Sequence, residues 1–225
     1  DEWHWCEYFA RVLMIIAIDG PSASGKGTLA KRLAAHLSFA HLDTGKIYRA
    51  VGHEVIRQGG DPEDERIALL VAQTLNPTAL SDPELSGDEA ALAASKVARM
   101  NDVRDVLLKF QRDFAENPPG GEAGAVLDGR DIGTIVCPDA AVKLYLVASA
   151  EVRAKRRHKE LLERGEASIY ARVLQDMKDR DDRDTNRSVS PLKQADDAFI
   201  LDTSGLNADK AFEAALVEVE KFGHR

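Results

Sequence analysis

The stretch that decides the fold is residues 14–28, MIIAIDGPSASGKGT. Its first part, Met14–Ile18, is a short apolar run of the kind that forms a buried strand. A glycine-rich turn follows, and apolar residues then recur at helical spacing, at Leu29, Leu33 and Leu37. A strand, a glycine loop and a helix in this order are typical of loops that bind phosphate groups at a helix N-terminus.

The loop residues are therefore candidates for binding the phosphates of a nucleotide. Glycine lets the backbone curl so that successive N–H groups point inward, and the helix N-terminus adds its partial positive charge. Lys26 is expected to reach the β- and γ-phosphates, where charge shifts during phosphoryl transfer. The strict pattern G-x4-G-K-[ST] is broken by one residue, because Gly27 stands between Lys26 and Thr28. The predicted nucleotide-binding residues are Gly20, Pro21, Ser22, Ala23, Ser24, Gly25, Lys26, Gly27 and Thr28.

Further short apolar runs predict four more strands. These runs are Phe39–Leu42, Ala125–Leu127, Val142–Val147 and Ala198–Leu201. They alternate with helical stretches, so we expect an α/β fold with a mostly parallel sheet covered by helices on both faces. Two segments interrupt the alternation, residues 59–88 and residues 151–187, and both are expected to be mobile excursions outside the sheet.

The composition excludes several classes of protein. The 225 residues carry 30 basic and 38 acidic side chains, a formal charge of −8, and no apolar run approaches the ~20 residues that cross a bilayer. An acidic balance argues against a general nucleic-acid coat but leaves room for a small anion in a local basic pocket. We therefore expect no nucleic-acid and no membrane partner. Because Cys6 and Cys137 lie far apart and the six histidines show no metal-ligand spacing, we expect reduced thiols, a cytoplasmic protein and no resident metal site.

Residues 1–13, DEWHWCEYFARVL, form a separate segment rich in aromatic residues. The segment opens with Asp1 and Glu2 and so lacks the positive region of a signal peptide. Our hypothesis is that Met14 is the native start and that residues 1–13 are a non-native extension, with a single domain over residues 14–225. The alternative is a genuine N-terminal helix that packs on the domain.

Four charged clusters indicate a second anionic ligand besides the nucleotide. Two of them, Leu42–Arg49 (LDTGKIYR) and Leu127–Thr134 (LDGRDIGT), follow predicted strands, where ligands bind in open α/β sheets. The third pairs Ser95 with Arg104 on one expected helical stretch, and the fourth is Arg180–Arg187 (RDDRDTNR). Singly, each cluster is typical of a solvated, salt-bridged surface. Together, behind a phosphate loop, they predict a site for an acceptor molecule.

These motifs resemble those of the bacterial cytidylate kinases, a family of the nucleoside monophosphate kinase group of P-loop kinases. The matching stretches extend from about Met14 to Asp202 and are IAIDGPSASGKGTLAK, LDTGKIYRA, the pair Ser95 and Arg104, LDGRDIGTIVCPDA and RDDRDTNRSVSPL. The resemblance implies a P-loop NTPase-type three-layer fold with a five-stranded parallel sheet. It also implies a monophosphate-binding arm at about residues 45–115 and a lid at about residues 153–187.

The activity that the resemblance implies is ATP-dependent phosphorylation of CMP and dCMP to CDP and dCDP, by direct in-line transfer, in pyrimidine nucleotide metabolism. ATP and Mg²⁺ are the implied cofactors, and we expect a cytoplasmic monomer. The chain departs from the family at Ala23, where glycine is common. Residues 76–92 are also too short for the β-rich insert of some members, so we expect a mostly helical arm.

The resemblance assigns roles in the acceptor site position by position. The residues implied to hold the CMP phosphate or to line its site are Arg49, Arg130, Arg187, Thr44 and Tyr48. Those implied to read the cytosine edge are Ser95, Arg104 and Asp131. The ribose hydroxyls would be contacted by Asp184, with Arg180 beside it.

The catalytic set implied by the resemblance consists of cations around the transferring phosphoryl group. Arg153 and Arg157, at i and i+4, would be lid arginines on one helix face. The full set is Lys26, Arg130, Arg187, Arg153 and Arg157. Arginine suits this chemistry because its fork matches phosphate oxygens bidentately and stays charged. No general base is needed, because the CMP phosphate is already ionised and catalysis is positioning plus charge neutralisation.

Two alternatives remain open from the residues alone. Another P-loop small-molecule kinase, such as an adenylate or shikimate kinase, would also use acceptor arginines, although LDGRDIGT together with RDDRDTNR argues against it. A nucleotide-binding switch without transfer activity would need no second site, and the four clusters would then be surface salt bridges.

Overall fold

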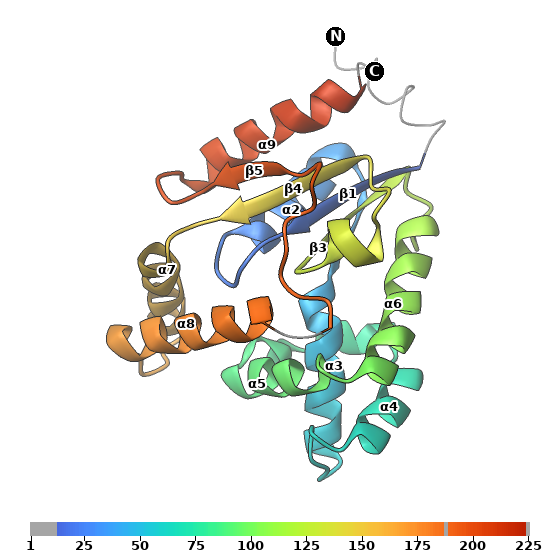
Figure 1. Cartoon of the computed structure of the whole chain (residues 1–225), viewed down its shortest axis with the longest axis vertical. Helices are drawn as coiled ribbons and strands as arrows, with labels where there is room; N and C mark the ends of the chain where they lie inside the picture. The colour runs from blue at the N-terminus through green and yellow to red at the C-terminus, as the bar shows by residue number, and fades with distance from the viewer. Residues whose placement is uncertain (1–12, 187–188, 224–225) are drawn as a thin grey trace. The chain divides into compact units, whose positions relative to one another are not determined.

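The computed structural model describes residues 13–186 and 189–223, in which strands are separated by one or more helices (Figure 1). The chain divides into two compact units. We call Leu42–Phe114 the helical unit, and the residues up to His41 together with those from Ala115 onward the sheet unit. The hypothesis about residues 1–13 concerns a segment that, apart from Leu13, lies outside the described residues.

The sheet has five strands in the order β2-β3-β1-β4-β5. Their bounds are Met14–Asp19 (β1), Ala40–Asp43 (β2), Gly124–Gly129 (β3), Val142–Val147 (β4) and Phe199–Asp202 (β5). β1 pairs in parallel with β3 and β4, and β4 pairs in parallel with β5. The predicted α/β fold with a five-stranded parallel sheet is confirmed.

The bounds of β4 match the prediction, and the other strands differ from it by one or two residues. The largest difference is in β3, which continues through Asp128 and Gly129. These two residues stay in the strand because they pair in register with Ile18 and Asp19 of β1. Because of this pairing, Asp19 of β1 and Asp128 of β3 lie close together at the carboxyl ends of the two strands.

Residues of the central strands are more deeply buried than those of the outermost strand β5. In β1 both faces are covered, since Ile16, Ala17 and Ile18 are each fully buried. Covering on both faces is what a central parallel strand requires. The last strand, β5, leaves Phe199 and Ile200 partly in solvent, as expected for an edge.

Helices α2 (Lys26–Leu37) and α9 (Ala208–Gly223) pack with these strands into one apolar core. The predicted helical period in α2 is confirmed, because Leu29 and Leu33 are buried together with the alanines that follow each of them. The residue after α2, Ser38, has a left-handed backbone and caps the helix. Its N–H group bonds back to the last turn of α2 and closes the helix.

Residues 151–186 form most of two helices outside the sheet, α7 (Ala150–Glu163) and α8 (Tyr170–Asn186). The two helices share a small apolar cluster of their own. Its buried members are Ala154, Leu161, Val173 and Met177. Apolar residues are sparse here, so charged side chains account for most of the remaining helix surface.

The helical unit contains α3 (Thr44–Arg57), α4 (Glu65–Gln73), the short turns η1 (Pro77–Ser81) and η2 (Pro83–Ser86), α5 (Asp88–Val97) and most of α6 (Asn101–Glu116). The expectation of a mostly helical structure over residues 45–115 is confirmed. The large or branched apolar residues buried in α3 and α5 are Ile47, Val51, Val55 and Val97, and small residues such as Ala90 and Ala93 are buried beside them.

One prediction about this unit is wrong. Ser95 and Arg104 do not share a helix, because α5 ends at Val97 and α6 begins at Asn101. The two residues before Asn101 bond through their N–H groups to carbonyls three positions back, in tight turns that interrupt the helix. Apolar residues continue across the break at Val97 and Val103, so their pattern does not reveal it.

Ile16→Ala tests the packing of the central strand. Ile16 is fully buried in the core formed with α2 and α9, so the substitution should lower the free energy of unfolding by about 2–5 kcal/mol. Val217→Ala, at a half-exposed position of α9, is the control and should change it by less than about 0.5 kcal/mol. Equal effects of the two substitutions in denaturant unfolding would contradict this packing.

Candidate active site

The loop between β1 and α2 is held in a conformation that needs residues without bulky side chains. A Cβ atom on Gly20 would lie 2.3 Å from the carbonyl oxygen of Leu146. Gly25 has a φ of 95°, in the left-handed region that favours glycine. Lys26 follows and donates from Nζ to the Pro21 carbonyl at 3.2 Å, so its side chain folds back along the loop.

Ala23, the position where the family often has glycine, also has a left-handed backbone, with a φ of 57°. This conformation costs an L-residue roughly 1–2 kcal/mol. The Ala23 methyl group packs against the apolar cluster of α7 and α8, a contact that glycine would lack. The departure from the family pattern therefore gives the loop an apolar contact with these two helices.

The two arginines of α7 that are predicted as lid residues, Arg153 and Arg157, have different surroundings. Arg153 is 4% exposed and forms two hydrogen bonds with the carboxylate of Asp181 on α8, at 3.0 and 2.5 Å. It also donates to the carbonyl oxygen of Ser22 in the phosphate loop at 3.3 Å. Arg157, one turn later, pairs with Glu160 at 3.1 Å. Arg153 therefore links α7 to both α8 and the phosphate loop.

Two sequence clusters meet in the sheet unit. Arg130, directly after β3, donates from Nε to a carboxylate oxygen of Asp184 on α8 at 2.8 Å. Arg180, one turn before Asp184, lies 4.0 Å from the same oxygen. LDGRDIGT and RDDRDTNR thus come together across 54 residues of sequence. Arg187 lies outside the described residues.

A buried carboxylate fixes the turn that carries Arg130 and Asp131. Asp19, at the end of β1, accepts hydrogen bonds from the N–H groups of Ile132 and Gly133 at 2.8 and 2.7 Å. Burial raises the pKa of Asp19 to about 6, although these two N–H groups favour the charged form. After Asp131 the chain makes one π-helical turn, η3 (Ile132–Val136).

A second aspartate lies beside the loop. Asp128 of β3 is 2% exposed and its Oδ1 lies 2.8 Å from Nε2 of His41 on β2. A Cβ atom on Gly27 would lie 3.7 Å from Oδ2 of Asp128, so this carboxylate borders the start of α2. Carboxylate oxygens are ligands that Mg²⁺ prefers, which makes Asp128 a candidate for holding that ion.

The remaining predicted site residues belong to the helical unit. The guanidinium of Arg104 lies 5.5 Å from the ring centroid of Tyr48, and Arg104 is 7% exposed. Arg49, next to Tyr48, donates to the Leu85 carbonyl at 3.1 Å. Ser95 donates its hydroxyl to the carbonyl four residues back in its own helix, at 3.2 Å. Thr44 is buried at the first turn of α3.

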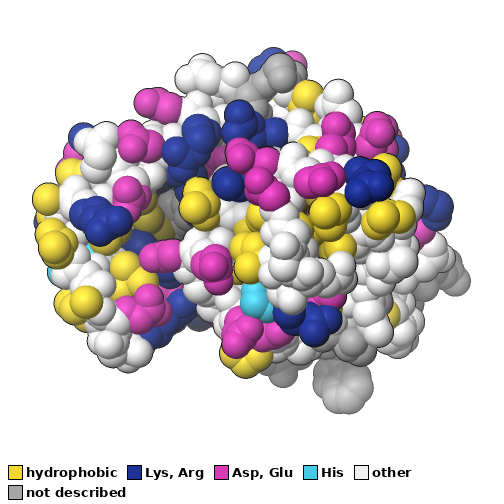
Figure 2. Space-filling view, turned by 90° about the horizontal axis from the view of Figure 1, so that it is seen from below, with side chains coloured by type: hydrophobic (Ala, Val, Ile, Leu, Met, Phe, Trp, Pro, Cys, Tyr) yellow, Lys and Arg dark blue, Asp and Glu magenta, His cyan; other side chains and the backbone are white. Residues whose placement is uncertain are grey.

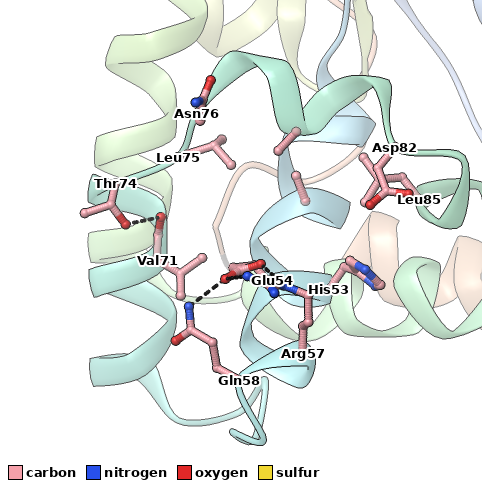
Figure 3. Close-up of a pocket in the computed structure, with 12 residues that line it drawn as sticks. His53, Glu54, Arg57, Gln58, Val71, Thr74, Leu75, Asn76, Asp82 and Leu85 are labelled. Atoms are coloured by element: carbon pink, nitrogen blue, oxygen red, sulfur yellow. Dashed lines mark hydrogen bonds and ion pairs between the residues drawn. The ribbon is translucent and has the colours of Figure 1, made fainter.

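The helical unit also contains a cavity of about 280 Å³ between α3, α4 and the following turns (Figure 3). None of the residues that line it is a predicted site residue. At its border, ligand atoms of His53, Asp82 and Glu84 lie within 4.8 Å of one another. An ion pair of 3.2 Å between His53 and Glu84 accounts for part of this proximity, and we assign no metal to the group.

The charges of the molecule are interleaved. On the face shown in Figure 2, Lys and Arg side chains lie among Asp and Glu side chains. In the sheet unit, Arg130 pairs with Asp184 and Arg153 with Asp181 in the same way. In the parts of the chain that the structure describes, no helix has the length and apolar character needed to cross a membrane.

Three residues near the loop are not predicted from the sequence. Asp19, His41 and Arg156 each act through a partner far away along the chain. Asp19 is the one with a local clue, because it is a charged residue at the end of an otherwise apolar strand. Arg156 is surrounded by other basic residues and looks like part of a solvated helix face.

A known protein family and known protein sequences match this chain over most of its length. The family model for cytidylate kinase matches residues 16–221. A cytidylate kinase from Paramagnetospirillum magneticum is 62% identical over 90% of this chain and 95% of its own length. One from Rhodospirillum rubrum is 57% identical over 90% of this chain and 95% of its own.

Among solved structures, an uncharacterized protein from Eubacterium ventriosum is similar, with a TM-score of 0.54 and 15% identity. The match covers 92% of this chain and 98% of that protein. At this identity the likeness concerns the fold alone.

Asp19→Asn tests the buried carboxyl. A carboxyl whose pKa is higher in the folded state stabilises that state when protonated, fully below about pH 4, and the contribution is lost as the pH rises through about 6. Asparagine does not titrate. The free energy of unfolding of the wild type minus that of the variant should therefore fall by on the order of 3 kcal/mol from pH 4 to pH 7.

Denaturant unfolding at several pH values measures this difference, and exposed Asp139→Asn controls for the loss of one charge. A difference that does not change with pH would contradict the raised pKa of Asp19.

Proposed function

Because the chain belongs to the cytidylate kinase family, we propose that it transfers the γ-phosphoryl group of ATP to CMP and dCMP. The products are ADP with CDP or dCDP, formed by direct in-line displacement. The observation that carries the proposal is the phosphate loop between β1 and α2, within a family match that extends over residues 16–221. The enzyme is a phosphotransferase with a phosphate group as acceptor.

In this proposal the loop Gly20–Thr28 binds the triphosphate of ATP. Its N–H groups and the N-terminus of α2 stabilise the phosphate oxygens. Lys26, which folds along the loop, would follow the negative charge that moves to the β–γ bridge during transfer. Arg153 and Arg157 would add positive charge from α7.

Mg²⁺ would accompany ATP and neutralise charge on the β- and γ-phosphates. The donors that fit this ion are oxygen atoms, which is what Asp128 supplies beside Gly27. His41 orients that carboxylate through its 2.8 Å contact. Thr28, in the first turn of α2, would supply a hydroxyl oxygen.

The acceptor phosphate of CMP would be bound by Arg130 together with Arg49 and Arg187. Arg130 pairs with Asp184 at 2.8 Å, so the substrate phosphate would replace or share that carboxylate as its partner. An exchange of one anion for another keeps the guanidinium paired in both states. Paired buried charges cost far less than a charge left alone.

Cytosine would be read by side chains that offer it complementary donors and acceptors. Arg104 presents donors beside the ring of Tyr48, which offers a flat surface for packing. Asp131 is buried after β3 and would accept from the amino group of the base. Ser95 would add a hydroxyl after exchanging its bond within α5. Asp184 and Arg180 would contact the ribose.

The chemistry needs no general base, because the attacking oxygen belongs to an ionised phosphate. The protein therefore contributes orientation of two phosphates in line and stabilisation of the spread charge. Closure of the helices around the nucleotides would exclude water, which would otherwise compete as acceptor. We further propose a cytoplasmic monomer; the wide separation of the two cysteines in the sequence supports reduced thiols in a reducing compartment.

A coupled assay with MgATP and different monophosphates tests the substrate. CMP and dCMP should give turnover at least tenfold more efficient than UMP or AMP, because the base site pairs with the cytosine edge. Preference for UMP or AMP would contradict the base assignment. Absence of transfer to all four would contradict the kinase, and calorimetric binding of CMP without ATP would then separate a two-site protein from a switch.

Arg130→Ala tests the acceptor phosphate site. Loss of this guanidinium should lower kcat/KM for CMP by at least tenfold and by up to about 10³-fold. Arg172→Ala removes the same charge from an exposed position of α8 outside the acceptor clusters and should change kcat/KM less than twofold. Similar kinetics of the two variants would remove Arg130 from the site.

A further inference from the structure

A further arginine of α7, Arg156, contacts the backbone of the phosphate loop. Its Nη1 lies 3.4 Å from the carbonyl oxygen of Ser24 and 3.1 Å from Oγ1 of Thr203. Its Nη2 donates to the carbonyl oxygen of Thr203 at 2.6 Å. Thr203 directly follows β5, is 3% exposed, and donates its hydroxyl to the same Ser24 carbonyl at 2.8 Å. One carbonyl of the loop thus accepts hydrogen bonds from two side chains that lie far away in the sequence.

Thr203 is itself fixed. Its N–H group bonds to the carbonyl of Val147, the last residue of β4, at 2.8 Å. Its hydroxyl lies 3.2 Å from the same carbonyl. The Ser24 carbonyl is therefore held against two parallel strands as well as against α7. The hydroxyl of Ser24, by contrast, is buried with no hydrogen-bond partner among the residues described, so the side chain does not hold this peptide.

A second loop carbonyl is held in the same way. Arg153 donates to the carbonyl oxygen of Ser22 at 3.3 Å and is anchored by the Ala148 carbonyl at 2.9 Å. Arg153 and Arg156 are three positions apart on α7, and Ser22 and Ser24 are two positions apart on the loop. Neighbouring arginines on one helix face therefore bind alternate carbonyls of the loop.

These contacts determine where the N–H groups of the loop point. In a planar trans peptide the C=O and N–H bonds point in opposite directions. The N–H groups of Ala23 and Gly25 therefore point away from the arginines that hold the preceding carbonyls. Both residues have positive φ, at 57° and 95°, as in backbone segments whose N–H groups converge on an anion.

We propose that Arg156 and Thr203 are positioning residues of the phosphate loop, which orient the Ser24–Gly25 peptide so that the Gly25 N–H faces the phosphates of the donor. The proposal rests on the proposed function, because it takes this loop to bind ATP. Arg153 also holds a loop carbonyl, but it and Arg157 are proposed in addition to act on the transferring phosphoryl group. Arg156 acts through the loop backbone and does not itself contact the transferring group.

Substitutions at both positions test the proposal. Thr203→Val removes the hydroxyl and keeps the shape, whereas Thr203→Ser keeps the hydroxyl. Arg156→Gln removes the guanidinium, and Lys155→Gln removes a charge from an exposed neighbour on α7 as the matched control. The probes are MgATP and inorganic tripolyphosphate, titrated calorimetrically, because tripolyphosphate has no base and reports on the loop alone. Thermal unfolding identifies the variants that are folded.

Thr203→Val and Arg156→Gln should each weaken the binding of both probes about tenfold, the scale of one hydrogen bond to a charged ligand. Thr203→Ser and Lys155→Gln should stay within twofold of the wild type. The variant that combines Thr203→Val with Arg156→Gln should lose less binding free energy than the sum of the losses of the two single variants, because both side chains bind one carbonyl. Should Arg156→Gln fail to fold, the comparison of Thr203→Val with Thr203→Ser decides.

Two results would overturn the proposal. One is a folded Thr203→Val variant that binds tripolyphosphate as tightly as the wild type. The other is a loss of ATP affinity without a loss of tripolyphosphate affinity, which would assign these residues to the base. A wild type that binds neither probe would instead overturn the proposed function and the assignment of the loop to phosphates.

Discussion

The orientation of the peptide groups between β1 and α2 is the constraint on which the rest of the site depends. N–H groups can face a polyanion only if the carbonyls of the same peptides are satisfied on the other side. Side chains from α7 and from the end of β5 supply those partners. The close approach of Gly20 to β4 and the left-handed backbone of Gly25 allow the loop to take this course. The fold therefore places hydrogen-bond donors that are distant in the sequence next to the carbonyl groups of the loop.

The pairing of arginines with aspartates near the phosphate loop explains how an acidic protein can bind two polyanions. Its formal charge of −8 is distributed so that Arg130 and Arg153 each have a carboxylate partner, Asp184 and Asp181. Such pairs contribute little net stability, since the cost of removing both charges from water offsets their attraction. They keep Arg130, which is partly buried, and Arg153, which is buried, paired near the carboxyl ends of the strands. Phosphates can then replace the carboxylates without leaving a cation unpaired.

The sequence reveals local features of the fold and site, and it misses those that depend on distant partners. The phosphate loop is predictable because strand, glycines, lysine and helix follow one another within 15 residues. The strands are predictable to within one or two residues, since their apolar runs are local, whereas their ends depend on pairing. The break between α5 and α6 is hidden because apolar spacing continues across it. Asp19 and Thr203 are recognisable only once the strands are placed side by side. The roles of Ser95, Arg104 and Arg187 stay predictions from the resemblance.

One molecule is expected to bind a triphosphate donor and a monophosphate acceptor at the same time, in line for transfer. The most direct measurement of this double occupancy is calorimetric titration with adenosine and cytidine joined through five phosphates, which spans both proposed sites. Binding should be one-to-one and at least about 100-fold tighter than that of ATP or of CMP alone, because the second site is filled without a further loss of translational freedom. Binding no tighter than that of ATP would contradict double occupancy.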